Sequence, residues 1–279
     1  IYGVSYGTSL ALEVSKVSGS AINGLILDSL IPSPSDAEYG LSYHSFNANR
    51  VGTQILQHCA ESPQCPGGPE LRQAYMTFLK ENKDVKIMGQ DPRRYLGTLL
   101  DIPRARPLIP HIIKALIEGN NNLNELTKTA NTLAATYYAD IAKLPQAPIS
   151  IPLVALISGS EDDARPDLTL DMLAQEHQTM GFTSAVPGHL VSNTLPLYAV
   201  LKPGPEMSLP SIFVLHGSLD PKTPHEGARK HVEALKTQTQ VHMMTLVDAP
   251  HGAFLSSQSC LKEPLKRFIT HPEAPLPSQ

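Results

Sequence analysis

Continuous apolar runs of strand length occur near both ends of the chain, and helical patterns follow them. Residues 24–30, 211–216 and 241–247 have the length and apolar character of buried strands. The pattern predicts helices from about Thr8 to Gly19, over 224–235, and after residue 253 to about residue 265. Because alternating strands and helices are typical of parallel crossovers, we predict an α/β fold with a mostly parallel sheet.

The stretch between these two parts, residues 32–205, follows a different pattern. Its apolar residues recur at three- and four-residue steps between prolines and glycines, as in amphipathic helices. The predicted helices cover residues 70–80, 107–118, 123–143 and 168–180. The apolar run 151–158 fits either a strand or the start of a buried helix. We therefore predict a sheet core of residues 1–31 and 206–279, interrupted by a mostly helical insertion over 32–205.

A G-x-S-x-G motif opens the chain, with Gly3, Ser5 and Gly7 at its fixed positions. This motif presents a serine nucleophile on a strained turn between a strand and a helix. Side chains two residues to either side of the serine are expected to collide with the turn, which explains the two glycines. Only Ile1 and Tyr2 remain of the strand before the motif, so we expect the chain to be the C-terminal majority of a larger hydrolase.

A serine hydroxyl needs an imidazole base, and the base needs a carboxylate that orients it. Asp220 follows the predicted strand 211–216, and His251 follows the next strand, so Ser5, Asp220 and His251 occur in the chain order nucleophile, acid, base. Each has an alternative: Asp220 as a turn or helix-capping residue, and His251 as one of eleven histidines. Asp248 is a rival acid, but it lies on the same loop as His251, so we favour Asp220.

The tetrahedral intermediate of acyl transfer also needs hydrogen-bond donors for its oxyanion. The backbone N–H of Tyr6, the residue after the nucleophile, is the predicted first donor. The second donor is expected from a segment before residue 1, because a loop near the start of such folds provides it. The 279-residue chain by itself is therefore expected to be inactive or severely impaired.

Composition excludes several classes of partner. The net charge is −4 and no basic run is present, which argues against nucleic acid as a ligand. No apolar stretch approaches the roughly 18 residues that a membrane span requires. The cysteines lack the paired Cys/His spacing of a zinc site, and serine chemistry needs no metal or organic cofactor. A small-molecule substrate is the partner that remains.

Three cysteines bear on the cellular compartment. Cys59 and Cys65 lie close together in a turn-rich segment, where they form either a short disulfide loop or two separate thiols. A disulfide favours an oxidising compartment, either the periplasm or the exterior, with the cytoplasm as the alternative. Cys260 is left over, so it is either a buried thiol or the partner of a cysteine outside the chain.

The motifs together resemble the α/β-hydrolase superfamily and, within it, the proline iminopeptidase and tripeptidyl aminopeptidase group. The resemblance rests on GVSYGT at residues 3–8, HGSLDPKTP at 216–224 and PHG at 250–252. It implies a helical cap, inserted here over residues 32–205, and cleavage of short peptides from a free N-terminus. Secreted members often carry cap cysteines like Cys59 and Cys65.

The same resemblance implies a binding residue for the substrate amine. Acidic side chains of the cap hold the amino group in that group of enzymes, and Ser160-Glu161-Asp162 is similar to their Glu-Asp pair. Glu161 is therefore the candidate, with a solvated acidic turn as the alternative. A cysteine usually precedes this glutamate, and Ser158 and Gly159 stand in that place here.

These observations predict a serine hydrolase that cleaves short peptides or amino-acid amides through an acyl-enzyme. Ser5 attacks the carbonyl, His251 takes and returns the proton, and Asp220 orients the imidazole. A carboxylesterase with the same three residues is one alternative. Another is a catalytically incompetent fragment or a binding module, whose missing N-terminal segment lies on another chain or was removed.

Overall fold

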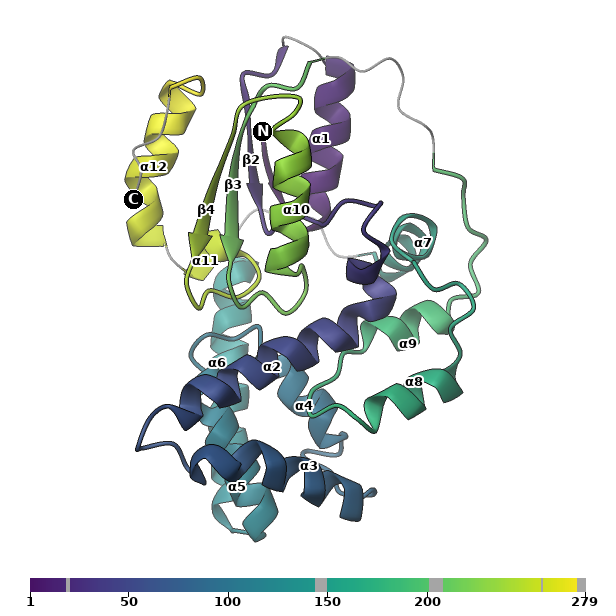
Figure 1. The fold of residues 1–279 in the computed structure, drawn as a ribbon, viewed down its shortest axis with the longest axis vertical. Coiled ribbons are helices and arrows are strands. Elements are labelled where there is room, and N and C mark those ends of the chain that lie inside the picture. The colour runs from purple at the N-terminus through teal and green to yellow at the C-terminus, as the bar shows by residue number, and fades with distance from the viewer. Residues whose placement is uncertain (19–20, 144–149, 201–207, 257, 275–279) are drawn as a thin grey trace. The chain divides into compact units, whose positions relative to one another are not determined.

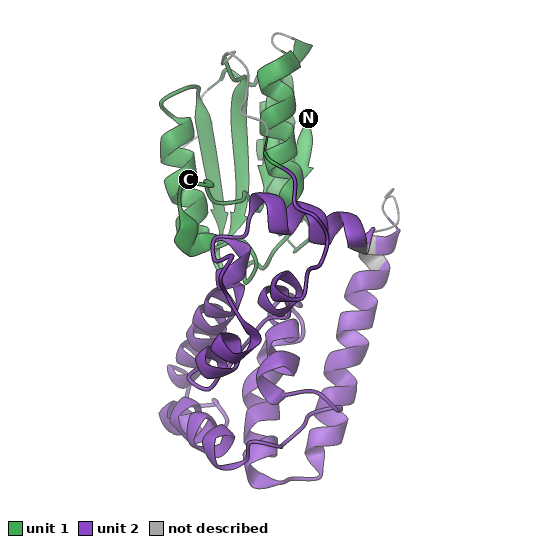
Figure 2. Cartoon of the chain, turned by 90° about the vertical axis from the view of Figure 1, so that its right-hand side faces the viewer, with its two compact units in different colours: residues 1–39, 199–279 green, residues 40–198 purple. Residues whose placement is uncertain are grey.

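The computed structural model describes residues 1–18, 21–143, 150–200, 208–256 and 258–274. The chain forms two compact units, shown in Figure 2. One unit comprises Ile1–Tyr39 and Ala199–Gln279 and contains the sheet; the other comprises Gly40–Tyr198 and is helical. The predicted boundaries at 31/32 and 205/206 fall a few residues from this division, and residue 205 itself lies outside the described residues.

The sheet unit is built on four parallel strands in the order β1-β2-β3-β4. The strands are β1 (Tyr2–Val4), β2 (Gly24–Asp28), β3 (Ser211–Gly217) and β4 (Val241–Leu246). Every residue of β3 is buried, as expected of an inner strand of a parallel sheet covered on both faces. The three apolar runs therefore form strands as predicted.

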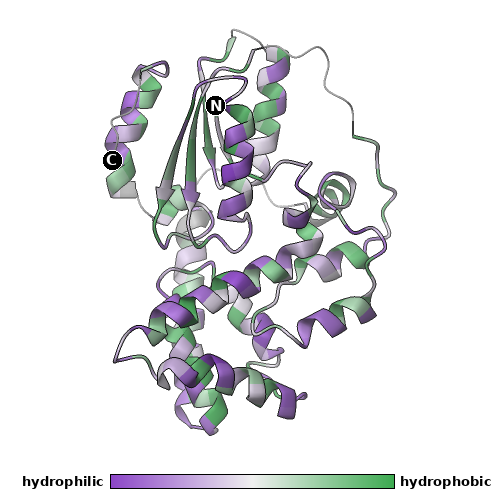
Figure 3. Cartoon of the chain, viewed as in Figure 1, coloured by the Kyte–Doolittle hydropathy of each residue, from purple (hydrophilic) through white to green (hydrophobic). Residues whose placement is uncertain are grey.

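Helices cover both faces of this sheet. Helices α1 (Tyr6–Ser18) and α10 (His225–Leu235) lie on one side of the strands, and α11 (Ala253–Ser256) and α12 (Gln258–Thr270) belong to the other side (Figure 1). Successive residues of β3 point to opposite faces: Ile212 packs with α1 and α10, and Phe213 stacks on Phe268 of α12 at 5.5 Å. Figure 3 shows the strands largely in the hydrophobic colour and much of α10 in the hydrophilic colour.

The ends of two predicted helices in the sheet unit need correction. Helix α1 ends at Ser18, and its predicted stop at Gly19 lies outside the described residues. The predicted final helix consists of two elements, α11 and the longer α12, which runs beyond residue 265 and contains Pro264.

The helical unit contains eight α-helices within its described residues. They are α2 (His44–Ala60), α3 (Leu71–Glu81), α4 (Pro92–Leu99), α5 (Ile109–Glu118), α6 (Asn122–Ala142), α7 (Ile151–Glu161), α8 (Leu170–His177) and α9 (Val186–Val191). Four of them, α3, α5, α6 and α8, were predicted from periodicity. The ambiguous run 151–158 is helical, and its residues Leu153 and Val154 are about half exposed.

Helix α2 is the longest element that the apolar pattern did not predict. Its buried face is made largely of small and polar residues, including Ser45, Asn47 and Gly52. The ring of Phe182 packs directly on Gly52, where an added Cβ would come within 2.3 Å of the ring. Fewer than half of the buried residues of α2 are Ala, Val or Leu, so its apolar stripe is narrow.

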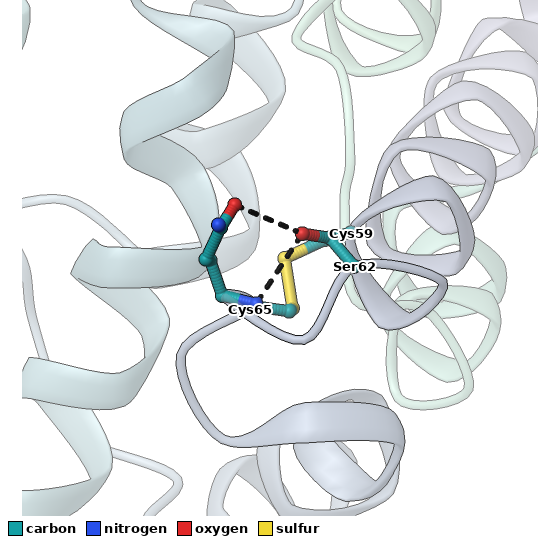
Figure 4. Close-up of a disulfide and its surroundings, with 4 residues drawn as sticks. Cys59, Ser62 and Cys65 are labelled. Atoms are coloured by element: carbon teal, nitrogen blue, oxygen red, sulfur yellow. Dashed lines mark hydrogen bonds between the residues drawn. A yellow bond between two sulfur atoms is a disulfide. The ribbon is translucent and has the colours of Figure 1, made fainter.

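A disulfide closes the segment after α2. Cys59 and Cys65 are bonded, with their Cα atoms 5.2 Å apart, and Ser62 lies inside the loop that they close (Figure 4). The backbone N–H of Ser62 donates to the Cys59 carbonyl and that of Cys65 donates to the Ser62 carbonyl, so the loop is a run of tight turns. Cys260 lies outside this bond and is exposed rather than buried.

We expect the double substitution Cys59→Ser/Cys65→Ser to lower the free energy of unfolding by roughly 2 kcal/mol, because the short loop is no longer closed in the unfolded chain. Denaturant unfolding under non-reducing conditions measures this difference. Cys260→Ser is the control, and its exposed position predicts a change within about 0.5 kcal/mol. Equal stability of the double variant and the parent would contradict the prediction.

Candidate active site

Each of the four strands is followed by a loop or turn that carries a polar residue of the candidate site. Because the strands are parallel, their carboxyl ends meet at one edge, as the arrowheads of β2, β3 and β4 show in Figure 1. Ser5 follows β1, Ser29 follows β2, Asp220 follows β3 and His251 follows β4. Ligands of open α/β sheets bind at this edge.

Ser5 occupies the junction between β1 and α1 in a strained conformation. Its φ angle is 55°, in the left-handed region that non-glycine residues seldom adopt. The N–H of Ser5 donates to the Asp28 carbonyl at 3.0 Å, and both the N–H and the hydroxyl of Thr8 donate to the Ser5 carbonyl. These hydrogen bonds hold Ser5 in a left-handed conformation that costs about 1–3 kcal/mol. A strained turn of this kind is expected of a nucleophile elbow.

The two glycines of the motif differ in their surroundings. A Cβ atom on Gly3 would lie 2.3 Å from the carbonyl oxygen of Gly7, so only glycine fits there. A Cβ atom on Gly7 would meet no neighbouring atom within 4 Å in the part of the chain that the structure describes. The predicted steric reason therefore holds for Gly3 and not for Gly7.

Asp220 and His251 form a hydrogen-bonded pair. His251 Nδ1 lies 2.9 Å from Asp220 Oδ2 and 3.2 Å from Oδ1. The carboxylate accepts, so Nδ1 carries the proton and Nε2 is left to take a proton from a substrate or a nucleophile. Asp220 is completely buried, whereas 13% of the His251 side chain is exposed.

The environment of Asp220 stabilises its charged form. Burial by itself raises the pKa of this carboxyl, but the charge of protonated His251 and the hydrogen bonds from His251 and Thr223 outweigh burial and hold the pKa below its usual range. The N–H groups of Lys222 and Thr223 each donate to Oδ1 at 2.8 Å, and the Thr223 hydroxyl donates to Oδ2 at 2.7 Å. Asp220 therefore has both roles that the sequence suggested: its side chain stabilises a turn, and it binds His251.

The rival acid Asp248 does not take this place. It is exposed, has a φ angle of 57°, and its backbone N–H donates to Ser218 Oγ at 2.8 Å. The residue turns the chain between β4 and the histidine loop, and aspartate is one of the few residues that tolerate a left-handed conformation.

Gly217, which the sequence did not single out, lets the loops after β3 and β4 touch. A Cβ atom there would lie 2.2 Å from the Ala249 carbonyl oxygen and 2.5 Å from that of Pro250, directly before His251. A Cβ atom on Gly252, the residue after the histidine, would by contrast reach only Leu255, at 3.6 Å. Gly252 instead provides a φ angle of 69°, which favours glycine.

His216 supports the acid from within the core. It is completely buried, and burial lowers its pKa, so the ring is neutral. Its Nε2 lies 3.0 Å from the Thr223 carbonyl oxygen, which can only accept, so Nε2 carries the proton. His216 therefore fixes Thr223, which in turn donates twice to Asp220. The sequence analysis treated His216 only as a competitor of His251.

The remaining predicted residues lie in two places. Tyr6 is the first residue of α1, directly after Ser5. Glu161 ends α7 in the helical unit, and the Tyr198 hydroxyl donates to its carboxylate. Burial, and then the charge of Glu161, raise the pKa of the adjacent Asp162 to about 6. Asp162 was not a predicted site residue, because sequence does not show the burial of a loop carboxylate.

A pocket of about 190 Å³ lies in the helical unit beside the end of α7. Its lining includes Asp163, Arg165, Leu168, Leu190 and Leu197. The Arg165 guanidinium forms an ion pair with Glu176 and lies 4.8 Å from the centre of the Tyr43 ring. The charge of this arginine is therefore already matched within the protein.

A parallel sheet that carries a left-handed serine and a buried Asp–His pair at its carboxyl edge is the arrangement of α/β-hydrolases. A family model described as TAP-like protein matches residues 195–278. This match places the chain in the α/β-hydrolase superfamily and supports a hydrolase. It covers Asp220 and His251 and leaves Ser5 outside.

No curated protein matches the chain. Among the described helices, none combines the length and apolar character needed to cross a bilayer. The described residues also contain no group of three or more His, Cys, Asp or Glu side chains arranged to hold a metal ion.

The raised pKa of Asp162 predicts a pH dependence of stability. The folded chain keeps the Asp162 proton up to about pH 6, whereas the unfolded chain loses it near pH 3.8, so this residue lowers stability as pH rises across that window. We expect Asp162→Asn to be more stable than the parent by roughly 1–2 kcal/mol at pH 7, and the difference to vanish near pH 4. Denaturant unfolding at both pH values measures it.

Asp167→Asn is the control for this prediction, because Asp167 is an exposed carboxylate nearby in the chain. If Asp162→Asn is no more stable than the parent at pH 7, the assigned pKa is wrong.

Proposed function

We propose that the protein is a serine hydrolase in which Ser5 is the nucleophile, His251 the general base and Asp220 the residue that orients the base. The observation that carries this proposal is the 2.9 Å contact between His251 and the buried Asp220 at the sheet edge where Ser5 sits in a left-handed turn. The chain order also agrees with that of α/β-hydrolases.

In the proposed mechanism, His251 Nε2 accepts the Ser5 hydroxyl proton as Oγ attacks the substrate carbonyl. The Tyr6 N–H donates to the oxyanion, and the charged form of Asp220 stabilises the imidazolium that forms. The proton then passes from His251 to the leaving group, which departs and leaves an acyl-serine. Water attacks this ester with His251 again as the base, and the acid product and free Ser5 are formed.

The proposed substrates are short peptides or amino-acid amides with a free amine. Glu161 is the proposed amine ligand, and the helical unit is the proposed cap that carries it. The neighbouring Asp162 supports this assignment, because repulsion from Glu161 helps to raise its pKa and a bound ammonium group would relieve that repulsion. With the disulfide in the same unit, a secreted or periplasmic location is proposed.

Labelling with a fluorophosphonate probe tests the nucleophile. We expect the probe to modify Ser5 in the parent even where turnover is impaired, because labelling needs the nucleophile and its base, and a lost oxyanion donor slows such a reaction without abolishing it. Mass mapping of the labelled peptide should find no modification there in Ser5→Ala. Asp220→Asn should lower the labelling rate roughly a thousandfold or more, because it changes the proton position on His251. Asp248→Asn is the matched control and should label like the parent, since asparagine also tolerates the left-handed turn.

Two results would contradict this proposal. Equal labelling of Ser5→Ala and the parent would show that Ser5 is not the nucleophile. Absence of labelling in a folded parent would favour the incompetent fragment or binding module.

Comparison of free and N-acetylated amino-acid naphthylamides tests the substrate class. A carboxylate that binds the amine predicts at least tenfold faster cleavage of the free form, since a hydrogen bond to a charged group is worth about 1.5–3 kcal/mol. Glu161→Gln should reduce this ratio mainly through KM. Equal rates for the two forms would reject the aminopeptidase, and faster cleavage of small esters would favour the carboxylesterase.

A further inference from the structure

Asp28 is a completely buried carboxylate at the end of β2 that has no role in the mechanism above. It accepts hydrogen bonds from four neutral donors. Ala253 N–H and the Ser29 hydroxyl donate to Oδ1 at 2.8 and 3.3 Å, and Phe254 N–H and the Tyr2 hydroxyl donate to Oδ2 at 3.0 and 2.9 Å. Both oxygens of the Asp28 side chain therefore act as hydrogen-bond acceptors.

These bonds connect the two halves of the proposed site. Tyr2 belongs to β1, the strand that ends at the nucleophile, and the Asp28 carbonyl also accepts the Ser5 N–H at 3.0 Å. Ala253 and Phe254 follow His251 by only two and three residues. One residue therefore contacts both the turn that carries Ser5 and the loop that carries His251.

Ser29 extends this connection by one residue. Its hydroxyl oxygen accepts the Gly252 N–H at 2.8 Å, so three consecutive backbone N–H groups after His251 bind to Asp28 and Ser29. Ser29 has a φ angle of 55°, and its N–H donates to the Leu215 carbonyl of β3 at 2.9 Å. The histidine loop is thus bound by two side chains at the end of β2, and Ser29 is itself bound to β3 through its backbone.

Tyr2 remains a donor in this arrangement. Burial, and then the Asp28 carboxylate, raise its pKa, so its hydroxyl stays protonated and binds the carboxylate. Asparagine at position 28 has almost the same shape, but its amide nitrogen would face either the Ala253 N–H or the donors Phe254 and Tyr2. The substitution Asp28→Asn therefore removes some of these hydrogen bonds without leaving a cavity in the core.

We propose that Asp28 is a positioning residue that sets the distance between His251 and Ser5 by binding the backbone on both sides of the site. The catalytic consequence rests on the proposed function, and the structural part rests on the hydrogen bonds of Asp28 and Ser29. An error of about 1 Å in such a distance can cost a hundredfold in rate.

The test compares the parent with Asp28→Asn and with Ser15→Ala. Ser15 is a matched control, because it is a buried serine of α1 whose hydroxyl donates to the Leu12 carbonyl at 2.7 Å. We expect Asp28→Asn to label with fluorophosphonate about 10- to 100-fold more slowly and to lower kcat with little change in KM. Ser15→Ala should label at the parent rate.

Two readouts do not depend on catalysis. Hydrogen exchange should accelerate at the amides of residues 252–254 in Asp28→Asn and stay unchanged in α1. The NMR signal of the proton between His251 Nδ1 and Asp220 should shift or broaden in Asp28→Asn and not in Ser15→Ala. Unchanged exchange, signal and labelling in a folded Asp28→Asn protein would overturn the proposal.

Tyr2→Phe is the second variant if Asp28→Asn does not fold. It removes a single donor and should slow labelling roughly two- to tenfold, with a smaller shift of the same NMR signal. No change in either readout would also overturn the proposal. If Ser5→Ala labels like the parent, the proposed function fails, and exchange and NMR still decide whether Asp28 holds the histidine loop.

Discussion

Parallel pairing of the four strands is the constraint on which the rest of the structure depends. Parallel strands cannot be joined by tight hairpins, so each connection must return along a face of the sheet, as the segments that contain α1 and α10 do. The same pairing puts all four carboxyl ends at one edge. Residues that are far apart in the sequence, such as Ser5 and His251, then follow strands that end at the same edge of a single sheet.

Backbone strain gathers at this edge. Four non-glycine residues of the described chain have positive φ angles, and three of them, Ser5, Ser29 and Asp248, follow β1, β2 and β4. Each is held by a hydrogen bond to a neighbouring loop or strand, which offsets the cost of its conformation. These left-handed residues change the direction of the chain sharply after each strand, so that the polar groups lie at the edge of the sheet.

Much of this arrangement could be predicted from the sequence. The apolar runs predicted β2, β3 and β4, and the position of Asp220 after one strand and His251 after the next predicted the pair that the structure joins. These features depend on local pattern, which sequence carries directly. The narrower peptidase group and the role of Glu161 remain predictions, because they rest on resemblance rather than on a contact with substrate.

What could not be predicted depends on contacts between distant residues. Helix α2 packs through Gly52 and small polar side chains as well as a narrow apolar stripe, so the apolar pattern did not distinguish it. Gly217 lies within the HGSLDPKTP motif but is not distinguished there, and Asp28 lies in no motif; the importance of both appears only when loops from other strands approach them. His216 stands in a quoted motif, but its contact with the Thr223 carbonyl needed coordinates to be seen.

The long connection between β2 and β3 has a consequence for how the chain folds. Residues 29–210 separate these adjacent strands, so their pairing closes a loop of roughly 180 residues, and each doubling of loop length adds about 0.6 kcal/mol to the entropic cost. The nucleophile turn and β2 are synthesised long before the strands that carry the acid and the base. Pairing of β2 with β3 is therefore a non-local event, whereas the helical unit lies wholly between these two strands in the sequence and has its own covalent link.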